Sequence, residues 1–260
     1  MTPSVEVSII IPTLRERASL ERLLPRLFAV LQAANLAAEV VIVDDDSRDD
    51  TDSLCRELAK HHALRLVTRT EERGLATAVL RGLSEAAGEI CIVMDADSSH
   101  PPEAVPALVE AARSPFCDVA IGSRYTRGGS ADENWGWFRR LNSSFATLLA
   151  RGLTRAADPL AGFFAIRRVT FDRAAPTLRP LGYKILLELI VRCDCRRVVE
   201  IPIRFQDRTI GKSKLSIAQQ WLYLRHLARL YAARYLPQPA GRGIPTLHPP
   251  TRETRRRRSA

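Results

Sequence analysis

The stretch Ile92–Glu103, IVMDADSSHPPE, places two carboxylates one residue apart, directly after an apolar run that begins at Ile90. Asp95 and Asp97 stand at positions i and i+2, so on a continuing strand they point the same way. At a bend just past the strand, both can reach one hard divalent cation. The alternative is structural, with the two side chains forming a turn and a helix cap before the prolines that follow. The residues that the chain places beside this pair decide between the two interpretations.

Short β-branched runs alternate with longer helical patterns on both sides of this stretch. Buried strands are predicted at Val7–Ile11, Val40–Val43, Leu64–Val67, Ile90–Met94, Val119–Ile121 and Val198–Phe205. Apolar residues recur at helical spacing between the early strands, and later helices are predicted at Arg139–Leu153, Ile185–Cys193 and Ile217–Tyr235. This alternation predicts an α/β fold with a mostly parallel central sheet flanked by helices.

Three polar clusters follow predicted strands: PTLRE (Pro12–Glu16), VDDDSRDDT (Val43–Thr51) and MDADSS (Met94–Ser99). In a doubly wound sheet, ligands bind outside the carboxyl ends of the strands, so the clusters should converge. Convergence favours the metal interpretation, because Mg²⁺ or Mn²⁺ held by one or two carboxylates keeps positions open for substrate phosphates. A diphosphate ligand is therefore expected. Asp45 is a candidate for a ribose or base contact, while capping remains the alternative for Asp44 and Asp46.

Composition bounds the class of protein. The 260 residues are 46% hydrophobic, enough for a sizeable core, and carry a formal net charge of +10. Half of that charge lies in residues 237–260, which hold six Arg, one Glu and five Pro and are predicted to form a disordered basic tail. The remaining charge does not indicate a nucleic-acid partner. Five scattered cysteines favour a reducing compartment, and no signal peptide or spanning helix is indicated, so we expect a cytoplasmic protein, soluble or peripheral.

Six segments occur in order between about Val5 and Leu236: PTLRE, VDDDSRDDT, RGLATAVLRGLSEAAGE, MDADSSHPPE, GSRYTRGG and FQDRTIGKSKL. Together they resemble the family 2 inverting glycosyltransferases of the GT-A fold, most of all the dolichol-phosphate (polyprenol-phosphate) mannose synthases. Each motif is weak alone, but the combination is specific. The resemblance implies a single GT-A domain over residues 1–236, ending in an amphipathic helix at about 214–236.

The resemblance also implies a reaction and its ligands: mannose would pass from GDP-mannose to a polyprenyl (dolichyl-type) phosphate with Mg²⁺ or Mn²⁺ as cofactor. The implied metal ligands are Asp95, Asp97 and Ser99. The implied nucleotide-sugar contacts are Pro12, Leu14, Glu16, Val43, Asp45, Asp95, Ala96, Arg208 and Lys214. The family usually has Tyr where Leu14 stands and Gln where Ser99 stands. These departures leave guanine versus uracil, and the third metal ligand, open.

Basic residues complete the implied site. A lipid phosphate is already anionic near pH 7, so the reaction needs no strong general base, but it needs positive charge to offset repulsion between two anionic groups. By resemblance, Arg208 and Lys214 serve the leaving diphosphate. The implied acceptor-phosphate residues are Arg124, Arg139, Arg140 and Ser143, and the implied catalytic residues are Asp97, Arg124, Arg208 and Lys214. For any single arginine, surface solvation is the alternative role.

Other functions are weighed against the same residues. A P-loop is excluded because Gln206 stands where its first glycine is required, and no G-x-G-x-x-G follows an early strand. A haloacid-dehalogenase phosphohydrolase would carry its D-x-D after the first strand rather than the fourth. A UDP-glucose or other UDP-sugar transferase of the same fold, and a non-catalytic sugar-nucleotide or membrane-binding module, remain alternatives.

The last predicted helix, Ile217–Tyr235, carries aromatic and basic residues. Ile217, Trp221, Leu224, Ala228, Tyr231 and Tyr235 are predicted to form one stripe, with Arg225 and Arg229 on another face. This content suits an interfacial helix at an anionic membrane, and the alternative is a helix docked on the core. We expect attachment at the cytoplasmic face of a membrane, through this helix and the basic tail or through a separate membrane-anchoring protein.

Overall fold

A computed structural model describes residues 5–130, 137–179, 181–205 and 217–236 of the chain. Its strands are β1 (Val7–Thr13), β2 (Ala38–Asp44), β3 (Leu64–Thr68), β4 (Ile90–Val93), β5 (Val119–Ser123), β6 (Phe164–Arg167) and β7 (Val198–Pro202). Its α-helices are α1 (Arg17–Ala33), α2 (Thr51–Leu58), α3 (Leu75–Glu85), α4 (Val105–Arg113), α5 (Trp137–Ala150), α6 (Arg168–Ala174), α7 (Ile185–Arg192) and α8 (Ile217–Tyr235). Two 3₁₀ turns, η1 (Pro102–Ala104) and η2 (Ala175–Thr177), precede α4 and follow α6.

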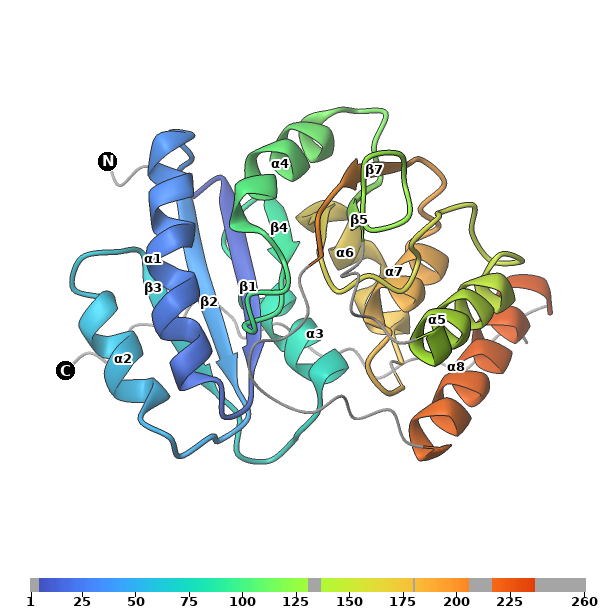
Figure 1. The fold of residues 1–260 in the computed structure, drawn as a ribbon, viewed down its shortest axis with the longest axis horizontal. Coiled ribbons are helices and arrows are strands. Elements are labelled where there is room, and N and C mark those ends of the chain that lie inside the picture. The colour runs from blue at the N-terminus through green and yellow to red at the C-terminus, as the bar shows by residue number, and fades with distance from the viewer. Residues whose placement is uncertain (1–4, 131–136, 180, 206–216, 237–260) are drawn as a thin grey trace.

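The strands form one seven-stranded sheet in the order β3-β2-β1-β4-β6-β5-β7. Figure 1 shows β3, β2, β1 and β4 side by side, with β5 and β7 beyond them. Parallel pairing joins β3, β2, β1 and β4, and also β5 and β7. β6 is antiparallel to both β4 and β5, between which it lies. The predicted mostly parallel α/β fold is confirmed. Strand β6 was not predicted, because its four residues continue from the Gly162-Phe163 loop without a helical or alternating pattern of their own.

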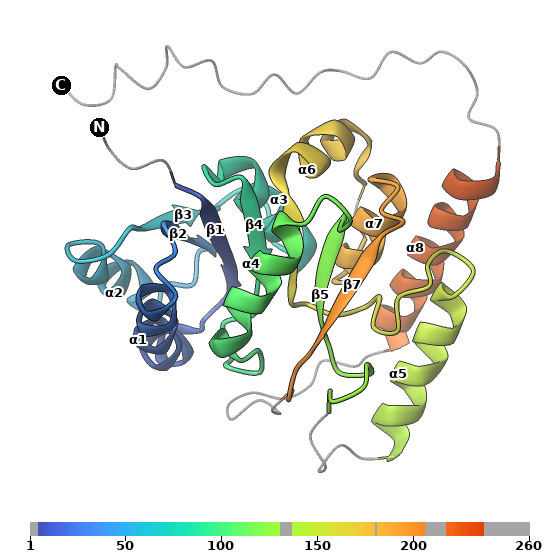
Figure 2. The same ribbon diagram turned by 90° about the horizontal axis from the view of Figure 1, so that it is seen from above.

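Each face of the sheet buries a separate hydrophobic cluster, because successive strand side chains point to opposite faces. Ile9 and Ile11 pack with α1 and α4 on one face, whereas Ile10 packs with α3 and α7 on the other. Figure 2 shows α1 and α3 on opposite sides of the sheet. The centres of β1 and β2, Ile9–Ile11 and Val40–Val43, are buried on both faces and form continuous apolar runs, which is why both strands were predicted from sequence.

Helices α5, α7 and α8 form a further layer at one end of the molecule (Figures 1 and 2). A third cluster joins them, including Ala150, Leu187 and Leu230. Tyrosine hydroxyls of α8 reach backbone carbonyls of the α5 region, as in the 2.6 Å bond from Tyr223 Oη to Ala146 O. This layer holds α5 beside the sheet end that carries β5 and β7.

Most described members of the predicted stripe of α8 lie on its outer side, where the interfacial interpretation places them, but Arg225 and Arg229 do not lie on a separate face. The side that packs inward carries Tyr223, Leu227 and Leu230, whereas Trp221 is 71% exposed and Leu224 is also exposed. Arg225 and Arg229 are exposed as well, so basic and apolar side chains share the outer side of the helix. The tyrosine hydroxyls decide this orientation, because a buried hydroxyl must find a partner. The outer side remains available for a surface contact.

Two predicted boundaries also change. β7 ends at Pro202 rather than Phe205; beyond it, Ile203 N donates to Ser123 O at 3.1 Å, and an isolated bridge pairs Ser130 with Arg204. The partner strand β5 ends at Ser123, opposite Pro202, so the ladder stops there. Helix α5 begins two residues before Arg139 and ends at Ala150 instead of Leu153. The predicted basic tail and the first residues of the predicted helix at 214–236 lie outside the described residues.

A buried ion pair holds α7 against α8. Glu188 Oε2 lies 2.6 Å from His226 Nε2, and both side chains are almost fully buried. Glu188 also accepts a 2.9 Å hydrogen bond from the backbone N–H of Arg179. These bonds, with the favourable charge of His226, outweigh the desolvation by burial and hold the pKa of Glu188 below its ordinary value. Removing the carboxylate would leave several donors without an acceptor.

We therefore expect Glu188→Ala to lower the free energy of unfolding by about 3–5 kcal/mol, the cost of breaking a buried pair by removing one partner. Urea denaturation at pH 7 measures it. Glu110→Ala is the matched control: Glu110 is 76% exposed, pairs with Arg113 on α4, and should change stability by no more than about 0.5 kcal/mol. A loss below about 1 kcal/mol in Glu188→Ala would contradict the expectation.

Candidate active site

Parallel register brings the three predicted polar clusters to one edge of the sheet. Thr13 pairs with Asp44 across β1 and β2, and Ile10 pairs with Val93 across β1 and β4. The backbone beyond each strand stays attached, since Met94 N donates to Ile10 O at 3.1 Å and Asp45 N donates to Thr13 O at 3.1 Å. The residues after all three strands therefore converge, as predicted.

Asp95, Asp97 and Ser99 follow β4 at this edge. The Asp95 side chain is 26% exposed, whereas Asp97 is buried and accepts a 3.0 Å hydrogen bond from the backbone N–H of Ser99. Ser98 between them has a φ of 63°, in the left-handed region, which sets the bend that separates the aspartates from Ser99. Within the described residues, Ser99 Oγ is buried without a hydrogen-bond partner. A hydrogen-bond acceptor, or a cation that takes oxygen ligands, would satisfy Ser99 Oγ.

These oxygens fit a hard divalent cation. Carboxylates and a hydroxyl are ligands that Mg²⁺ and Mn²⁺ accept, and two carboxylates leave coordination positions for phosphate oxygens. In the described part of the chain, no group of three or more His, Cys, Asp or Glu side chains is arranged to hold a metal ion. Ser99 as a third protein ligand stays a prediction.

His100 holds the Asp95 backbone in place. Its Nδ1 accepts a 2.9 Å hydrogen bond from the N–H of Asp95, and its ring stacks on Phe163 with centroids 5.1 Å apart. Burial lowers the pKa of His100, although nearby Asp95 and Asp97 oppose the shift, so Nδ1 stays an acceptor. At Gly162, an added Cβ would come within 3.2 Å of Asp95 Oδ2. No role was predicted for His100 or Gly162, although the segments SHPPE and AGFF contain them.

The aspartates after β2 are satisfied within the protein. Asp44, the last residue of β2, accepts bonds from Thr13 Oγ1 at 3.0 Å and Ser47 N at 2.9 Å, so it holds the loop after β2 and does not cap α2, whose N-cap is Asp50. Asp45 accepts bonds from Arg69 Nε at 2.7 Å and Gly74 N at 2.8 Å, one on each carboxylate oxygen. A ribose contact by Asp45 would use a remaining lone pair of these oxygens, and it stays a prediction. Arg69 was not predicted, because its partner lies 24 residues away.

The other predicted nucleotide contacts differ in exposure. Leu14 is exposed at the edge, and Glu16 accepts a 2.8 Å bond from Ser19 at the start of α1. Pro12 is buried, and the Val43 side chain packs into the core beside Gly82. Ala96 is likewise part of the core, so Val43 and Ala96 can meet a ligand only through their backbone. All five roles stay predictions.

Arg124, predicted at the acceptor phosphate, makes a bidentate ion pair with Asp158. Arg124 Nε and Nη2 donate to the two carboxylate oxygens at 2.8 and 2.7 Å, and Asp158 is fully buried. Burial alone would lower the pKa of Arg124, but the hydrogen bonds and charge of Asp158 outweigh it and raise the pKa. Glu200 of β7 in turn accepts the N–H of Asp158 at 3.0 Å. Asp158 stands in the ADPLAG segment and was not assigned a role from sequence.

The structure describes only some of the other residues predicted at the two phosphates. Ser143 of α5 lies 2.9 Å from Tyr125 Oη, which brings α5 to the residue next to Arg124. Arg139 and Arg140 are in the first turns of α5, but their side chains lie outside the described residues. Arg208 and Lys214 lie outside the described residues altogether. Their proposed roles at the two phosphates stay predictions.

Lys184, just before α7, adds a cation that was not predicted. Its Nζ lies 4.5 Å from the centre of the Tyr183 ring. Burial lowers the pKa of Lys184 from 10.5 to about 8; the charge of Arg124 adds to this shift, while Asp158 and Asp95 oppose it. Lys184 therefore belongs to the charge cluster at the active-site edge. The GYK segment that contains it carries no motif from which this could be derived.

A match to a family model identifies the chain. The model of glycosyl transferase family 2 matches residues 8–174, which include all three strand-end clusters and Arg124. The chain belongs to glycosyl transferase family 2. The predicted family is thus confirmed, and with it the prediction that this protein is a glycosyltransferase.

Curated relatives within the family are similar over most of the chain. It is 43% identical over 230 residues to the dolichol-phosphate mannosyltransferase of Pyrococcus furiosus, covering 87% of this chain and 64% of that protein. It is 42% identical to the dolichol-phosphate mannosyltransferase of Mycosarcoma maydis, covering 90% of this chain and 81% of that one. For the Saccharomyces cerevisiae dolichol-phosphate mannosyltransferase, the identity is 37% and the coverage 89% of each chain.

Solved structures support the GT-A fold of this family 2 member. Glucosyl-3-phosphoglycerate synthase from Mycobacterium tuberculosis aligns with a TM-score of 0.61 at 19% identity, over 90% of this chain and 81% of that one. The mannosyltransferase of Pyrobaculum calidifontis, solved with GDP-Man and Mn²⁺, aligns with a TM-score of 0.60 at 22% identity, over 89% of this chain and 64% of that one. At these identities the likeness shows the fold, and the predicted fold is confirmed.

The shifted Lys184 makes stability depend on pH. Because its pKa is lower in the folded state, the unfolded chain binds more protons between about pH 8 and 10.5, so its contribution to stability rises with pH there. We expect Lys184→Met to gain more stability, relative to the unchanged protein, at pH 8 than at pH 10. Urea denaturation at both values checks this, with Lys60→Met, at an exposed lysine, as control. An equal effect at both pH values would contradict it.

Proposed function

We propose that this glycosyltransferase transfers mannose from GDP-mannose to a polyprenyl phosphate of the dolichyl type. The observation that carries the proposal is the 37–43% identity to dolichol-phosphate mannosyltransferases over 87–90% of the chain. The geometry supports it, because Asp95, Asp97 and the unsatisfied Ser99 Oγ lie at the edge where ligands of such sheets bind. A diphosphate-linked sugar suits a site with this donor set.

The bond changes follow from the two substrates. An oxygen of the acceptor phosphate attacks C1 of mannose while the bond from C1 to the donor diphosphate breaks, and GDP leaves with the electron pair. Attack from the face opposite the leaving group inverts the configuration at C1. Because the acceptor oxygen is already anionic, no residue has to remove a proton from it. What this chain must supply is positioning and positive charge.

Asp95, Asp97 and Ser99 would hold Mg²⁺ or Mn²⁺, and the cation, when bound, supplies positive charge to the leaving diphosphate. We assign Arg208 and Lys214 to the same diphosphate, and Arg139 or Arg140 with Ser143 to the acceptor phosphate. The base and ribose of the donor are assigned to the edge formed by Pro12, Leu14, Glu16, Val43 and Asp45.

Arg124 would set the acceptor site by charge and position. Asp158 fixes the guanidinium by two hydrogen bonds, and the Phe205 ring lies 5.3 Å from its central carbon. An arginine fixed in this way loses little conformational entropy when a phosphate arrives. Lys184 adds a second positive charge nearby, and Tyr125 connects the position of Arg124 to Ser143.

A lipid acceptor requires a surface that meets the membrane. In the described part of the chain, no helix is long and apolar enough to cross a bilayer. We propose that α5 and α8 lie against the cytoplasmic face of a membrane. Phe145 and Leu148 of α5, and Trp221 and Leu224 of α8, expose apolar side chains, and Arg225 lies on the same outer side of α8. Aromatic, aliphatic and basic groups together suit an interface with anionic lipids. The basic tail and a separate membrane-anchoring protein are further proposed contacts.

The decisive test is transfer of label to lipid. The protein is incubated with Mn²⁺, a short polyprenyl phosphate and labelled GDP-mannose or UDP-glucose, and the lipid is extracted into organic solvent. Label should enter the organic phase from GDP-mannose alone. Label from UDP-glucose alone would replace the proposed donor, and label from neither would contradict the proposed reaction.

The metal assignment has its own test. Asp97→Asn keeps the shape of the side chain but loses its charge, so the Mn²⁺-dependent thermal stabilisation by GDP should disappear and transfer should fall by about a hundredfold or more. Asp52→Asn, at an exposed residue of α2 that pairs with Arg56, is the control and should leave both unchanged. Retention of Mn²⁺-dependent stabilisation in Asp97→Asn would contradict the assignment.

A further inference from the structure

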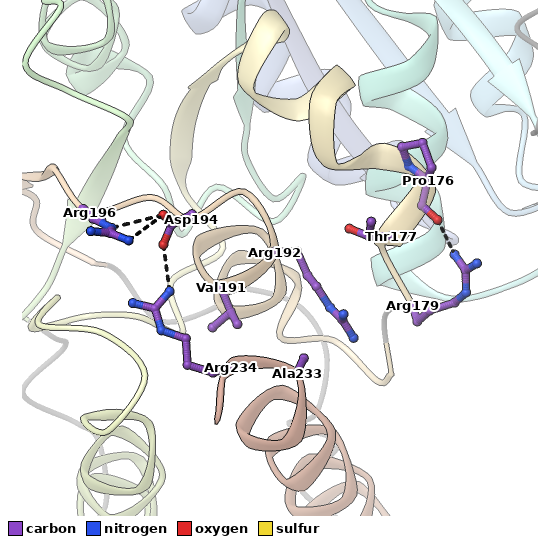
Figure 3. A pocket seen from close by; sticks show the side chains of 9 residues that line it. All are labelled: Pro176, Thr177, Arg179, Val191, Arg192, Asp194, Arg196, Ala233 and Arg234. Atoms are coloured by element: carbon purple, nitrogen blue, oxygen red, sulfur yellow. Dashed lines mark hydrogen bonds and ion pairs between the residues drawn. The ribbon is translucent and has the colours of Figure 1, made fainter. Parts of the chain in front are cut away.

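A cavity of about 690 Å³ lies between η2, the end of α7 and the end of α8 (Figure 3). Its lining consists of Pro176, Thr177, Arg179, Val191, Arg192, Asp194, Arg196, Ala233 and Arg234. Four of the nine side chains are arginines, contributed by three separate segments: the loop after η2, the end of α7 with the loop that follows, and the end of α8. We call this cavity the arginine pocket. Its volume falls within the range typical of small-molecule sites, about 300–1,000 Å³.

The arginine pocket lies at the edge of the sheet opposite the active site. The loop that carries Asp194 and Arg196 leads into β7, and Asp118, just before β5, accepts the N–H of Arg196 at 3.0 Å. The pocket therefore adjoins the starts of β5 and β7. Both β4 and β5 are antiparallel to β6, so they run the same way, and Asp95 follows the far end of β4. An anion in this pocket is neither the donor diphosphate nor the reacting acceptor phosphate.

Positive charge in the pocket exceeds the negative charge beside it. Arg196 and Arg234 share a single carboxylate, Asp194, at 3.0 and 2.7 Å. Arg179 Nη1 donates only to backbone carbonyls within the described residues, those of Pro176 at 3.0 Å and Leu178 at 2.7 Å. A smaller adjoining cavity of about 180 Å³ shares Thr177, Arg192 and Asp194 and adds another arginine, Arg173.

Arg192 is the least satisfied member. Its Nε lies 3.4 Å from Glu188 Oε1, but that carboxylate is already bound to His226 and to the N–H of Arg179. Among the described residues, Arg192 Nε is buried without a hydrogen-bond partner. Figure 3 shows Arg192 between Arg179 and the Asp194–Arg234 pair. The Arg192 side chain is nevertheless 17% exposed, so the outer part of its guanidinium borders the cavity.

The helix dipole explains the positions of only two of the four arginines in the pocket. Arg192 and Arg234 stand in the last turns of α7 and α8, where a cation interacts favourably with the helix dipole. Arg179 and Arg196 lie in loops and have no such reason to be there. The dipole also does not explain why arginines from separate segments surround one cavity.

We propose that the arginine pocket binds the phosphate group of a phosphate monoester, either a free anion or the headgroup of an anionic lipid. Guanidinium groups match phosphate oxygens with paired N–H donors, and a phosphate placed between Arg179 and Arg192 would face unused donors of both. The volume accommodates a phosphate together with part of the group that carries it. Because the pocket joins η2, α7 and α8, a bound anion would fix the end of α8 to the sheet.

The test compares two probes on the full chain in metal-free buffer containing a chelator, at one fixed ionic strength. Inorganic phosphate is titrated by calorimetry, and vesicles of phosphatidic acid in phosphatidylcholine are compared with pure phosphatidylcholine by sedimentation. The double variant Arg179→Gln/Arg192→Gln removes the two donors but keeps hydrogen-bonding groups. Arg56→Gln/Arg81→Gln removes two exposed arginines from α2 and α3 and is the matched control.

We expect the pocket variant to weaken at least one probe about tenfold, and the control variant to change neither by more than about twofold. Loss of phosphate binding identifies a free-anion site, and loss of phosphatidic acid binding alone identifies a headgroup site. Equal binding of both probes by the pocket variant and the unchanged chain would overturn the proposal, as would no binding of either by the unchanged chain. Circular dichroism and GDP binding with Mn²⁺ report whether the variant is folded, and neither depends on mannosyl transfer.

Discussion

Parallel hydrogen bonding between β1 and its two neighbours, β2 and β4, fixes where every functional group at the active-site edge can lie. The register from Thr13 to Asp44 makes β1 and β2 end together, and the register from Ile10 to Val93 places Asp95 and Asp97, which follow β4, at the same edge. A shift of one residue in either pair would turn the buried side chains of that strand to the other face, which both hydrophobic clusters oppose. The position of Asp95 and Asp97 therefore depends on packing far from the site itself.

This convergence gathers negative charge, and the structure balances it in two ways. Asp44 accepts hydrogen bonds from Thr13 and Ser47. Asp45 accepts hydrogen bonds from Gly74 and from Arg69, which also neutralises its charge. Asp95 instead remains partly exposed, with its backbone held by His100. Carboxylates satisfied by the protein position the loops, while the pair after β4 keeps oxygen atoms that suit a cation and its substrate.

Helix α7 relates the two ends of the molecule. Lys184, with its lowered pKa, precedes the helix at the active-site edge, and Arg192 ends it in the arginine pocket. The eight residues of the helix span about 12 Å at 1.5 Å per residue. Glu188, halfway along, joins α7 to α8 through His226. A ligand in the pocket and a substrate at the edge would thus act on one short, buried element.

The sequence by itself determined the parallel sheet, the strands β1 to β5 and β7, and the gathering of PTLRE, VDDDS and MDADSS at one edge. These depend on local periodicity and on the order of strands and helices, which can be read along the chain. Only the tertiary structure decided the antiparallel insertion of β6, the inward face of α8, and the partners of the charged groups. Asp45 meets Arg69 and Arg124 meets Asp158 across 24 and 34 residues. Folding determines which side chains are buried together, and buried charges must then be neutralised by one another. Neither of these effects produces a periodic pattern in the sequence.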